Sequence, residues 1–301
     1  MRELVAQQVF PEVPVSTWLQ RFVDDVLIGW FGWLWDILGD VIRWLVRWLE
    51  FFLVDPPLPG FLPDGAGTLV VILAFTAIAY AAGRWKLALF TFLAFGFVDA
   101  MGLFPGTMRA LSLTLVATVF AAGVGVPFGI WAARNKAVSA TVRPILDFMQ
   151  TMPAFVYLLV AIILFRVGAP AGVIASFIFA TPPAVRLTEL GIRQVDAEVV
   201  EAARAFGARD SELLVQVQLP LARPTIMAGI NQVIMLSLSM VVIAGLAGAG
   251  GVANEIVAGV TRLQPGRGLA AGLAVVILAI FLDRVTAAFG SPVEGSRGGT
   301  A

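Results

Sequence analysis

The feature that most constrains this chain is a series of long apolar segments. A helix that crosses a membrane needs about 20 predominantly apolar residues, because the hydrocarbon core is about 30 Å thick and a helix rises about 1.5 Å per residue. Charged residues make up only 13% of the 301 residues, whereas soluble domains carry about 25%. The sequence therefore predicts an all-α polytopic membrane protein with seven spans, at 66–83, 86–104, 110–133, 145–165, 169–187, 224–248 and 268–289.

Several residue types needed for enzyme chemistry are absent. The chain has no cysteine and no histidine, which removes disulfides, thiolate nucleophiles and the commonest metal ligand and general base. A phosphate-binding loop needs Gly-Lys before Ser or Thr, but the only lysines, Lys86 and Lys136, follow Trp85 and Asn135. We therefore expect no enzyme activity, no metal and no cofactor in this chain. Because 20 basic residues balance 20 acidic ones, no nucleic-acid partner is expected.

The basic residues are distributed unevenly between the two sides of the predicted membrane. Twelve Lys and Arg residues fall in loops on one side, and four, Arg109, Arg166, Arg262 and Arg267, fall on the other. Lys and Arg accumulate in cytoplasmic loops. This distribution predicts that the long polar loop at 188–223 and the C-terminus lie in the cytoplasm, and that the N-terminus lies outside.

Residues 16–53 are apolar but carry a polar stripe at helical spacing, formed by Asp25, Gly29, Gly32, Asp36, Asp40, Arg43, Arg47 and Glu50. Six of the eight tryptophans flank this stripe, and tryptophan favours the boundary between membrane and water. The pattern predicts an amphipathic helix lying on the outer membrane face. The alternative is an eighth span whose charges face other helices.

The long cytoplasmic loop begins with a predicted short helix at 194–207. Asp196 and Glu198 in its first turn suit the helix dipole, and Gly207 is placed to end it with a positive φ. One face should be apolar, formed by Val195, Val199, Ala202, Ala203 and Phe206. A second short helix is expected at 210–218, closed by Leu219-Pro220 before the next span.

As a consecutive sequence pattern, this loop resembles the EAA-x3-G-x9-I-x-LP signature of ABC importer permeases. Glu201-Ala202-Ala203, Gly207 and Leu219-Pro220 match the signature, and Val217 replaces its isoleucine. The resemblance implies that the loop docks on a separate ABC ATPase subunit, which would bind ATP and Mg. The residues implied for this coupling are Glu198, Glu201, Ala202, Ala203, Gly207, Leu219 and Pro220.

Further stretches are similar to the permeases of glycine betaine/proline importers, at 150–158, 180–188, 224–232, 238–244 and 276–284. The similarity covers 109–290 almost continuously. It implies a type I ABC importer permease core of five helices at 106–290. The N-terminal hundred residues match only in architecture, and before the core we expect an interfacial region at 1–60 and two accessory helices at 61–105. A polar tail at 291–301 follows the core. The similarity also implies a permease homodimer in the lipid of a bacterial cytoplasmic (inner) membrane, a separate extracytoplasmic solute-binding protein, and osmoprotective import of glycine betaine, proline or related compatible solutes.

The sixth span has no charged residue but carries amide, hydroxyl and thioether groups that suit a zwitterionic solute. The candidate lining of the translocation path is Asn231, Gln232, Ser237, Ser239 and Met240. The alternative is that these groups hold helices together. Two other functions remain open: a permease for another small amine or amino acid, and an ion-coupled secondary transporter, which should show inverted repeats and buried ionisable groups. Asp147 is expected to pair with Arg143, four residues earlier.

Overall fold

The computed structural model describes residues 14–54, 56–57 and 65–290, so the predictions for the N-terminal end and for the tail at 291–301 lie outside the described residues. Every regular element in the described part of the chain is helical. The elements are α1 Val15–Arg21, η1 Phe22–Ile28, α2 Gly32–Leu53, α3 Ala66–Ala100, α4 Phe104–Arg134, α5 Lys136–Thr151, α6 Ala154–Phe165, α7 Ala169–Arg193, α8 Ala197–Ala205, α9 Asp210–Glu212, η2 Leu213–Gln218, α10 Leu219–Ala244, η3 Gly245–Ala247, α11 Val252–Thr261 and α12 Pro265–Gly290.

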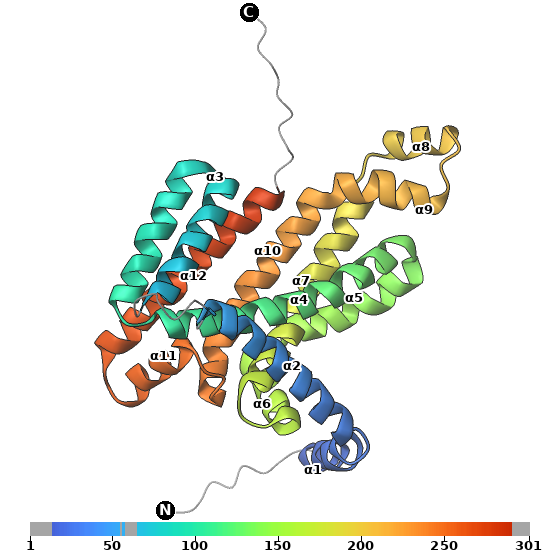
Figure 1. Ribbon diagram of the computed structural model, residues 1–301. Coiled ribbons are helices and arrows are strands. Elements are labelled where there is room, and N and C mark those ends of the chain that lie inside the picture. The colour runs from blue at the N-terminus through green and yellow to red at the C-terminus, as the bar shows by residue number, and fades with distance from the viewer. Residues whose placement is uncertain (1–13, 55, 58–64, 291–301) are drawn as a thin grey trace, which may run out of the picture.

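Five helical segments of the described chain are long and apolar enough to cross a membrane (Figure 1). They are Ala66–Gly83, Phe104–Arg134, Ala169–Arg193, Asp210–Ala247 and Pro265–Gly290. These segments confirm, by length and composition, the spans predicted at 66–83, 110–133, 169–187, 224–248 and 268–289.

The span predicted at 145–165 is not one straight helix. Helices α5 and α6 meet at an angle of 96°. Pro153 has no N–H to continue a helix and disfavours the helical conformation of the residue before it, and Met152 accordingly has φ −68° and ψ 135°. The prediction missed this bend because Met152-Pro153 lies within an otherwise continuous apolar run.

Helix α3 folds back on itself after the apolar segment Ala66–Gly83 and so has two arms (Figure 1). The span predicted at 86–104 is the second arm, which ends at Ala100, and α4 begins at Phe104. The two arms of α3 lie side by side (Figure 1), and the rings of Phe75 and Phe95 are 5.3 Å apart. Phe281 of α12 contacts both rings. This aromatic cluster attaches the α3 hairpin to the last helix.

Helix α7 is at the centre of the structure and packs mainly against α4 and α10. Its contact with α4 is so close that a Cβ added to Gly129 would lie 2.6 Å from both Thr188 Cβ and Val185 O. Such distances leave no room for a side chain. The C-terminal half of α7 is therefore held rigidly between its two neighbours.

The predicted amphipathic helix at 16–53 is broken in two, because a turn at Gly29–Phe31 separates η1 from α2. Helix α2 has three faces. One packs on the protein through buried Gly39, Ile42 and Val46, one carries the charged residues, including an Asp40–Arg43 pair at 2.7 Å, and one exposes apolar residues. The exposed apolar face consists of Trp33, Ile37, Val41, Trp44, Trp48, Phe51 and Phe52.

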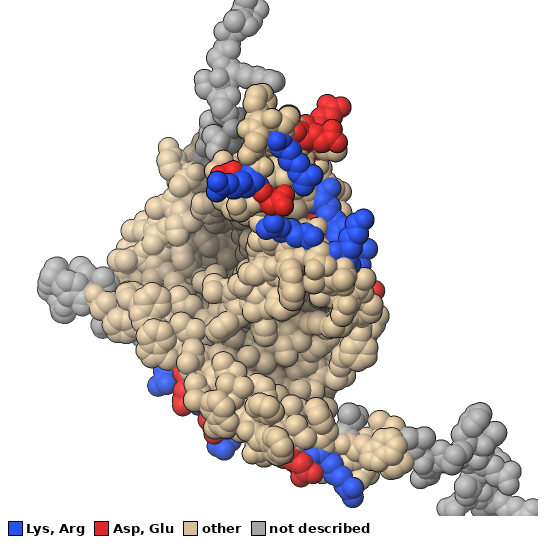
Figure 2. Space-filling view, turned by 90° about the vertical axis from the view of Figure 1, so that its right-hand side faces the viewer, with Lys and Arg blue, Asp and Glu red and all other residues tan. Residues whose placement is uncertain are grey.

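Charged side chains gather at two opposite ends of the face drawn in Figure 2, and an uncharged surface separates the two groups. This arrangement is the one expected when the middle of a protein is surrounded by hydrocarbon, because exposed charge in a bilayer core is costly.

Candidate functional site

Helix α8 projects from the end of the long helices α7 and α10 (Figure 1). Asp196 caps its first turn by accepting a hydrogen bond from the Glu198 N–H at 2.9 Å. Glu198, Glu201 and Ala202 are exposed, and Ala203 is half-buried toward the rest of the loop. Since none of the residues of α8 is buried, the helix presents most of its surface to its surroundings.

Gly207 ends this helix as the sequence predicted, with φ +86°. The Gly207 N–H donates to the Arg204 carbonyl at 2.9 Å, and the Ala208 N–H donates to the Ala203 carbonyl at 3.1 Å. No atom lies within 4 Å of the position that a Cβ on Gly207 would take. The glycine is therefore required by its backbone conformation and not by crowding.

The apolar face predicted for this helix is present but uncovered. Val199 is 42% exposed and Phe206 is 93% exposed, and Ala202 lies between them on the same face. Only Val195, in the turn before α8, packs against a buried cluster around Ile192. We call Val199, Ala202 and Phe206 the exposed stripe of α8.

The second short helix predicted at 210–218 does not end at Leu219-Pro220. It continues through the π-helical turn η2 into α10, as one helical segment from Asp210 to Ala247. Pro220 is the second residue of α10 and directly follows the π-helical turn η2. Leu219 is half-buried and Pro220 is exposed.

The candidate path residues on α10 do not lie on one face. Ser237 and Met240 are buried within the chain, whereas Gln232 and Ser239 are exposed together. The Ser239 hydroxyl donates to the Met235 carbonyl one turn earlier, at 2.9 Å.

The Asn231 side chain makes an interhelical contact. Its amide nitrogen donates to Asp283 of α12 at 2.8 Å, which joins the two helices. The structure thus brings Gln232 and Ser239 to an open surface and turns the other three candidates toward the protein interior or a neighbouring helix.

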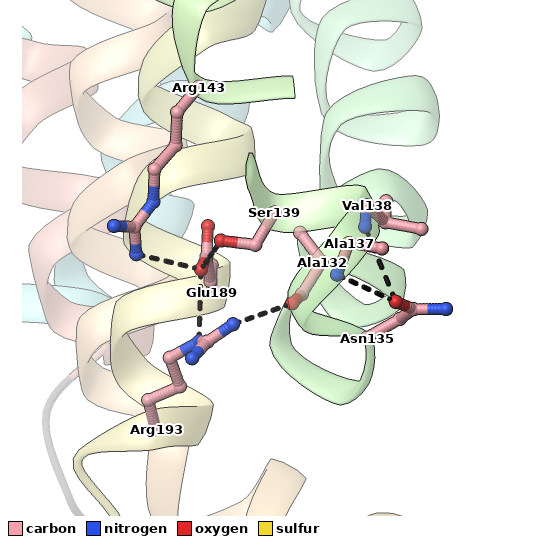
Figure 3. Close-up of polar contacts among 8 residues, drawn as sticks. All are labelled: Ala132, Asn135, Ala137, Val138, Ser139, Arg143, Glu189 and Arg193. Atoms are coloured by element: carbon pink, nitrogen blue, oxygen red, sulfur yellow. Dashed lines mark hydrogen bonds and ion pairs between the residues drawn. The ribbon is translucent and has the colours of Figure 1, made fainter. Parts of the chain in front are cut away.

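A polar cluster joins α4, α5 and α7 at the same end of the molecule as α8 (Figure 3). It was not predicted from the sequence. Glu189 of α7 accepts hydrogen bonds on one carboxylate oxygen from Ser139 at 2.7 Å and from Arg143 at 3.0 Å, and the same oxygen forms an ion pair with Arg193 at 2.9 Å. Arg193 also donates to the Ala132 carbonyl of α4 at 2.9 Å. The pairing predicted within α5 is wrong: Arg143 pairs with Glu189, and Asp147 pairs with Arg186.

The start of α5 is defined by a cap in the same cluster. The Asn135 side-chain oxygen accepts from the N–H groups of Ala137 at 2.9 Å and Val138 at 3.3 Å (Figure 3). This cap starts α5 immediately after α4 and brings Ser139 and Arg143 alongside α7.

Among the described residues, no group of three or more acidic, cysteine or histidine side chains is placed to hold a metal ion. At the start of the span α12, Arg267 pairs with Glu255 of α11. The hydrogen bond from Arg267 holds the pKa of Glu255 below its usual value.

Comparison with known proteins places the chain in a family. The profile of binding-protein-dependent transport system inner membrane components matches residues 125–294. The chain is similar to the glycine betaine transport system permease protein OpuAB of Bacillus subtilis, with 44% identity over 276 residues, 92% of this chain and 94% of the relative. It is also similar to the glycine betaine/carnitine transport permease protein GbuB of Listeria monocytogenes, with 41% identity over 283 residues, 93% of this chain and 96% of the relative.

Among solved structures, the chain resembles the inward-facing MetNI methionine ABC transporter, with a TM-score of 0.56 over 62% of this chain and 95% of that chain, at 22% identity. The chain belongs to the family of binding-protein-dependent transport system inner membrane components. It is a multi-pass ABC importer permease, and the fold class predicted from the sequence is confirmed. As a transport subunit it is not itself an enzyme.

Proposed function

We propose that this chain forms the membrane path of an ATP-driven importer for glycine betaine, proline or a related compatible solute. The observation that carries the cargo class is the 44% identity to a glycine betaine permease over nearly the full length of both chains. The exposed polar residues Gln232 and Ser239 on α10 support a path for a zwitterion, because neither carries a charge that would hold the solute.

The proposed partner at the cytoplasmic end is a separate ABC ATPase that binds ATP and Mg. The coupling surface comprises Glu198, Glu201, Ala202, Ala203 and Gly207 on the α8 side, with Leu219 and Pro220 at the start of α10. The exposed stripe of α8 supports this role, because an uncovered apolar surface on an otherwise polar loop is typical of an interaction site.

The remaining parts of the complex follow the same proposal. A second copy of the chain completes the path, and a separate solute-binding protein delivers the solute on the outer side. Residues 106–290 are the permease core, 61–105 the accessory helices, 291–301 the cytoplasmic tail and 1–60 a region that lies on the outer membrane face. The three faces of α2 support the last assignment, because charge, apolar surface and protein contact each have a separate side.

Transport by the reconstituted complex tests the cargo. Permease, ATPase and solute-binding protein are placed in vesicles with ATP inside, and uptake of labelled glycine betaine is followed from the outside. We expect uptake that stops when ATP is omitted. Uptake of another solute class with glycine betaine at background would contradict the proposal.

Thiol labelling tests the orientation, because the chain has no cysteine of its own. A cysteine at Arg262 should react with an impermeant reagent from outside the cell, and one at Arg209 only after the membrane is permeabilised. On α2, Asp40→Cys should react from outside whereas Val41→Cys should not, since the first faces water and the second lipid. Reactivity that instead changes steadily along α2 would mean that the helix crosses the membrane.

A further inference from the structure

We propose that Glu189 is a positioning residue. It couples helix α5, and the bend between α5 and α6, to the end of α7 from which the docking loop, residues 194–207, leaves the protein. This inference rests on the proposed function, in which α8 docks on an ATPase. Glu189 would then connect movement at the ATPase to the part of the membrane domain that contains the bend at Met152-Pro153.

Glu189 is unusual among the charged residues whose side chains the structure describes, because it alone is buried, with its side chain 7% exposed. A buried carboxylate is stable only when donors replace the water that it has lost. Two donors meet at its Oε1, Ser139 at 2.7 Å and Arg143 at 3.0 Å, and Arg193 adds an ion pair at 2.9 Å (Figure 3). The two hydrogen bonds are charge-assisted and therefore among the stronger ones in the protein.

Both hydrogen-bond donors come from α5, which has few other attachments to α7. Only Ser139 and Leu146 of α5 are buried, while Ile145 is 54% exposed and Phe148 is 65% exposed. The second ion pair between these helices, Asp147–Arg186, is exposed, and exposed pairs contribute little. The inner half of α5 is thus held on α7 chiefly by polar contacts to Glu189.

The link continues directly to the docking loop. Arg193 is the last residue of α7, and α8 begins four residues later at Ala197. Arg193 donates to the Ala132 carbonyl of α4 and forms an ion pair with Glu189 one turn earlier in α7. Since Glu189 in turn contacts α5, the end of α7 is fixed to α4 and α5 just before the loop leaves the protein. A displacement of α8 that moves the end of α7 therefore carries Glu189, and with it α5.

At its other end, α5 reaches the 96° bend with α6. The Tyr157 hydroxyl of α6 donates to the Met149 carbonyl of α5 across this bend. Movement of α5 is consequently transmitted to α6. Movement of the docking loop would therefore change the angle between the two helices, and with it the membrane path.

The variant Arg143→Met tests this link most cleanly. It removes the charged donor on α5 and leaves the Arg193–Glu189 pair within α7 intact. Because the Arg143 side chain is 61% exposed, the fold should tolerate the change. In vesicles we expect ATPase binding and ATP hydrolysis to stay at the wild-type level, while the number of solutes imported per ATP falls about tenfold, the size of a typical coupling effect.

Arg186→Met is the matched control, because it removes the exposed pair between the same two helices and should keep the wild-type ratio. Glu189→Gln is the second variant and should lower the ratio at least as much as Arg143→Met. A spin-label pair at Ala140 and Leu190 gives an independent structural readout. The distance between the labels should stay fixed through the ATP cycle in the wild type and become broadly distributed in Arg143→Met.

A wild-type transport ratio in Arg143→Met, or an equal loss in Arg143→Met and Arg186→Met, would overturn the inference while leaving the proposed function intact. Failure of the wild-type chain to bind any ATPase subunit would overturn both. A fall in transport and hydrolysis together, with lower thermal stability, would mean that Glu189 is a purely structural contact.

Discussion

Helices α7 and α8 are separated by three residues and have opposite environments. In α7, the residues from Ala180 to Val185 are all buried, and its neighbours approach to backbone contact. In α8 no residue is buried, and Phe206 just beyond it is 93% exposed. The hydrophobic effect stabilises only surface that is removed from water, so α7 is stabilised within this chain whereas the apolar stripe of α8 needs another molecule. The chain thus carries a rigid stem, α7, followed directly by an exposed apolar stripe, which we propose as the docking surface.

The largest effect should follow from filling the contact between α7 and α4. Gly129→Leu places a side chain where even a Cβ would lie 2.6 Å from Thr188 Cβ and Val185 O. Overpacking of a close contact costs about 1–3 kcal/mol and occasionally more. We expect little folded protein in the membrane fraction and a lower melting temperature of what remains. Gly123→Leu on the same helix is the control, because its Cβ meets nothing within 4 Å; similar losses in the two variants would mean that the close contact is not what stabilises the stem.

Truncating the exposed stripe should leave the stem unaffected. Phe206→Ala removes a side chain that is 93% exposed, so the melting temperature of the isolated permease should not change. A central aromatic side chain at an interface contributes about 2 kcal/mol, close to thirtyfold in Kd. Titration with the purified ATPase subunit measures this loss. Val215→Ala is the control, since Val215 is 60% exposed but lies outside the stripe; equal affinities for the Phe206 and Val215 variants would contradict the docking role.

A smaller effect is expected from the cap of α8. Asp196→Ala removes the acceptor of the Glu198 N–H bond, which costs about 1 kcal/mol of helix stability. Since α8 has no buried residue to compensate, its amide hydrogens should exchange faster, while those of α7 keep their wild-type rates. Hydrogen exchange followed by mass spectrometry measures both helices in one sample. Asp196→Ser should restore slow exchange, and unchanged exchange in the alanine variant would show that packing stabilises α8 after all.

The sequence predicted the helical class, the main apolar spans and the positive φ of Gly207, because these follow from local composition and backbone preference. It did not predict the bend at Met152-Pro153 or the turn that separates η1 from α2, because the apolar pattern continues across both positions. Glu189 was missed for a different reason. Its donors Ser139 and Arg143 lie about fifty residues earlier, and no local pattern reveals a contact that depends on how α5 and α7 are arranged in space.

The exposure of Phe206 could also not be predicted from the sequence. The spacing of Val199, Ala202 and Phe206 predicted an apolar face correctly, but apolar spacing alone does not distinguish a face that packs within the chain from one that awaits a partner. The distinction between α7 and α8 therefore comes from the structure, and the assignment of α8 as the coupling element rests on it together with the signature at 201–220.

The pair Gly207→Val and Gly207→Asn tests this assignment most directly. Asparagine tolerates the positive φ of this position, whereas a β-branched residue is strained there by about 1–2 kcal/mol. Substrate-stimulated ATP hydrolysis and solute uptake should be measured together in vesicles containing each variant with its ATPase and solute-binding protein. The account predicts that both activities fall together in Gly207→Val and stay near the wild-type level in Gly207→Asn, with equal amounts of folded permease. Wild-type uptake by Gly207→Val with its ATPase bound normally would contradict the role of this loop in coupling.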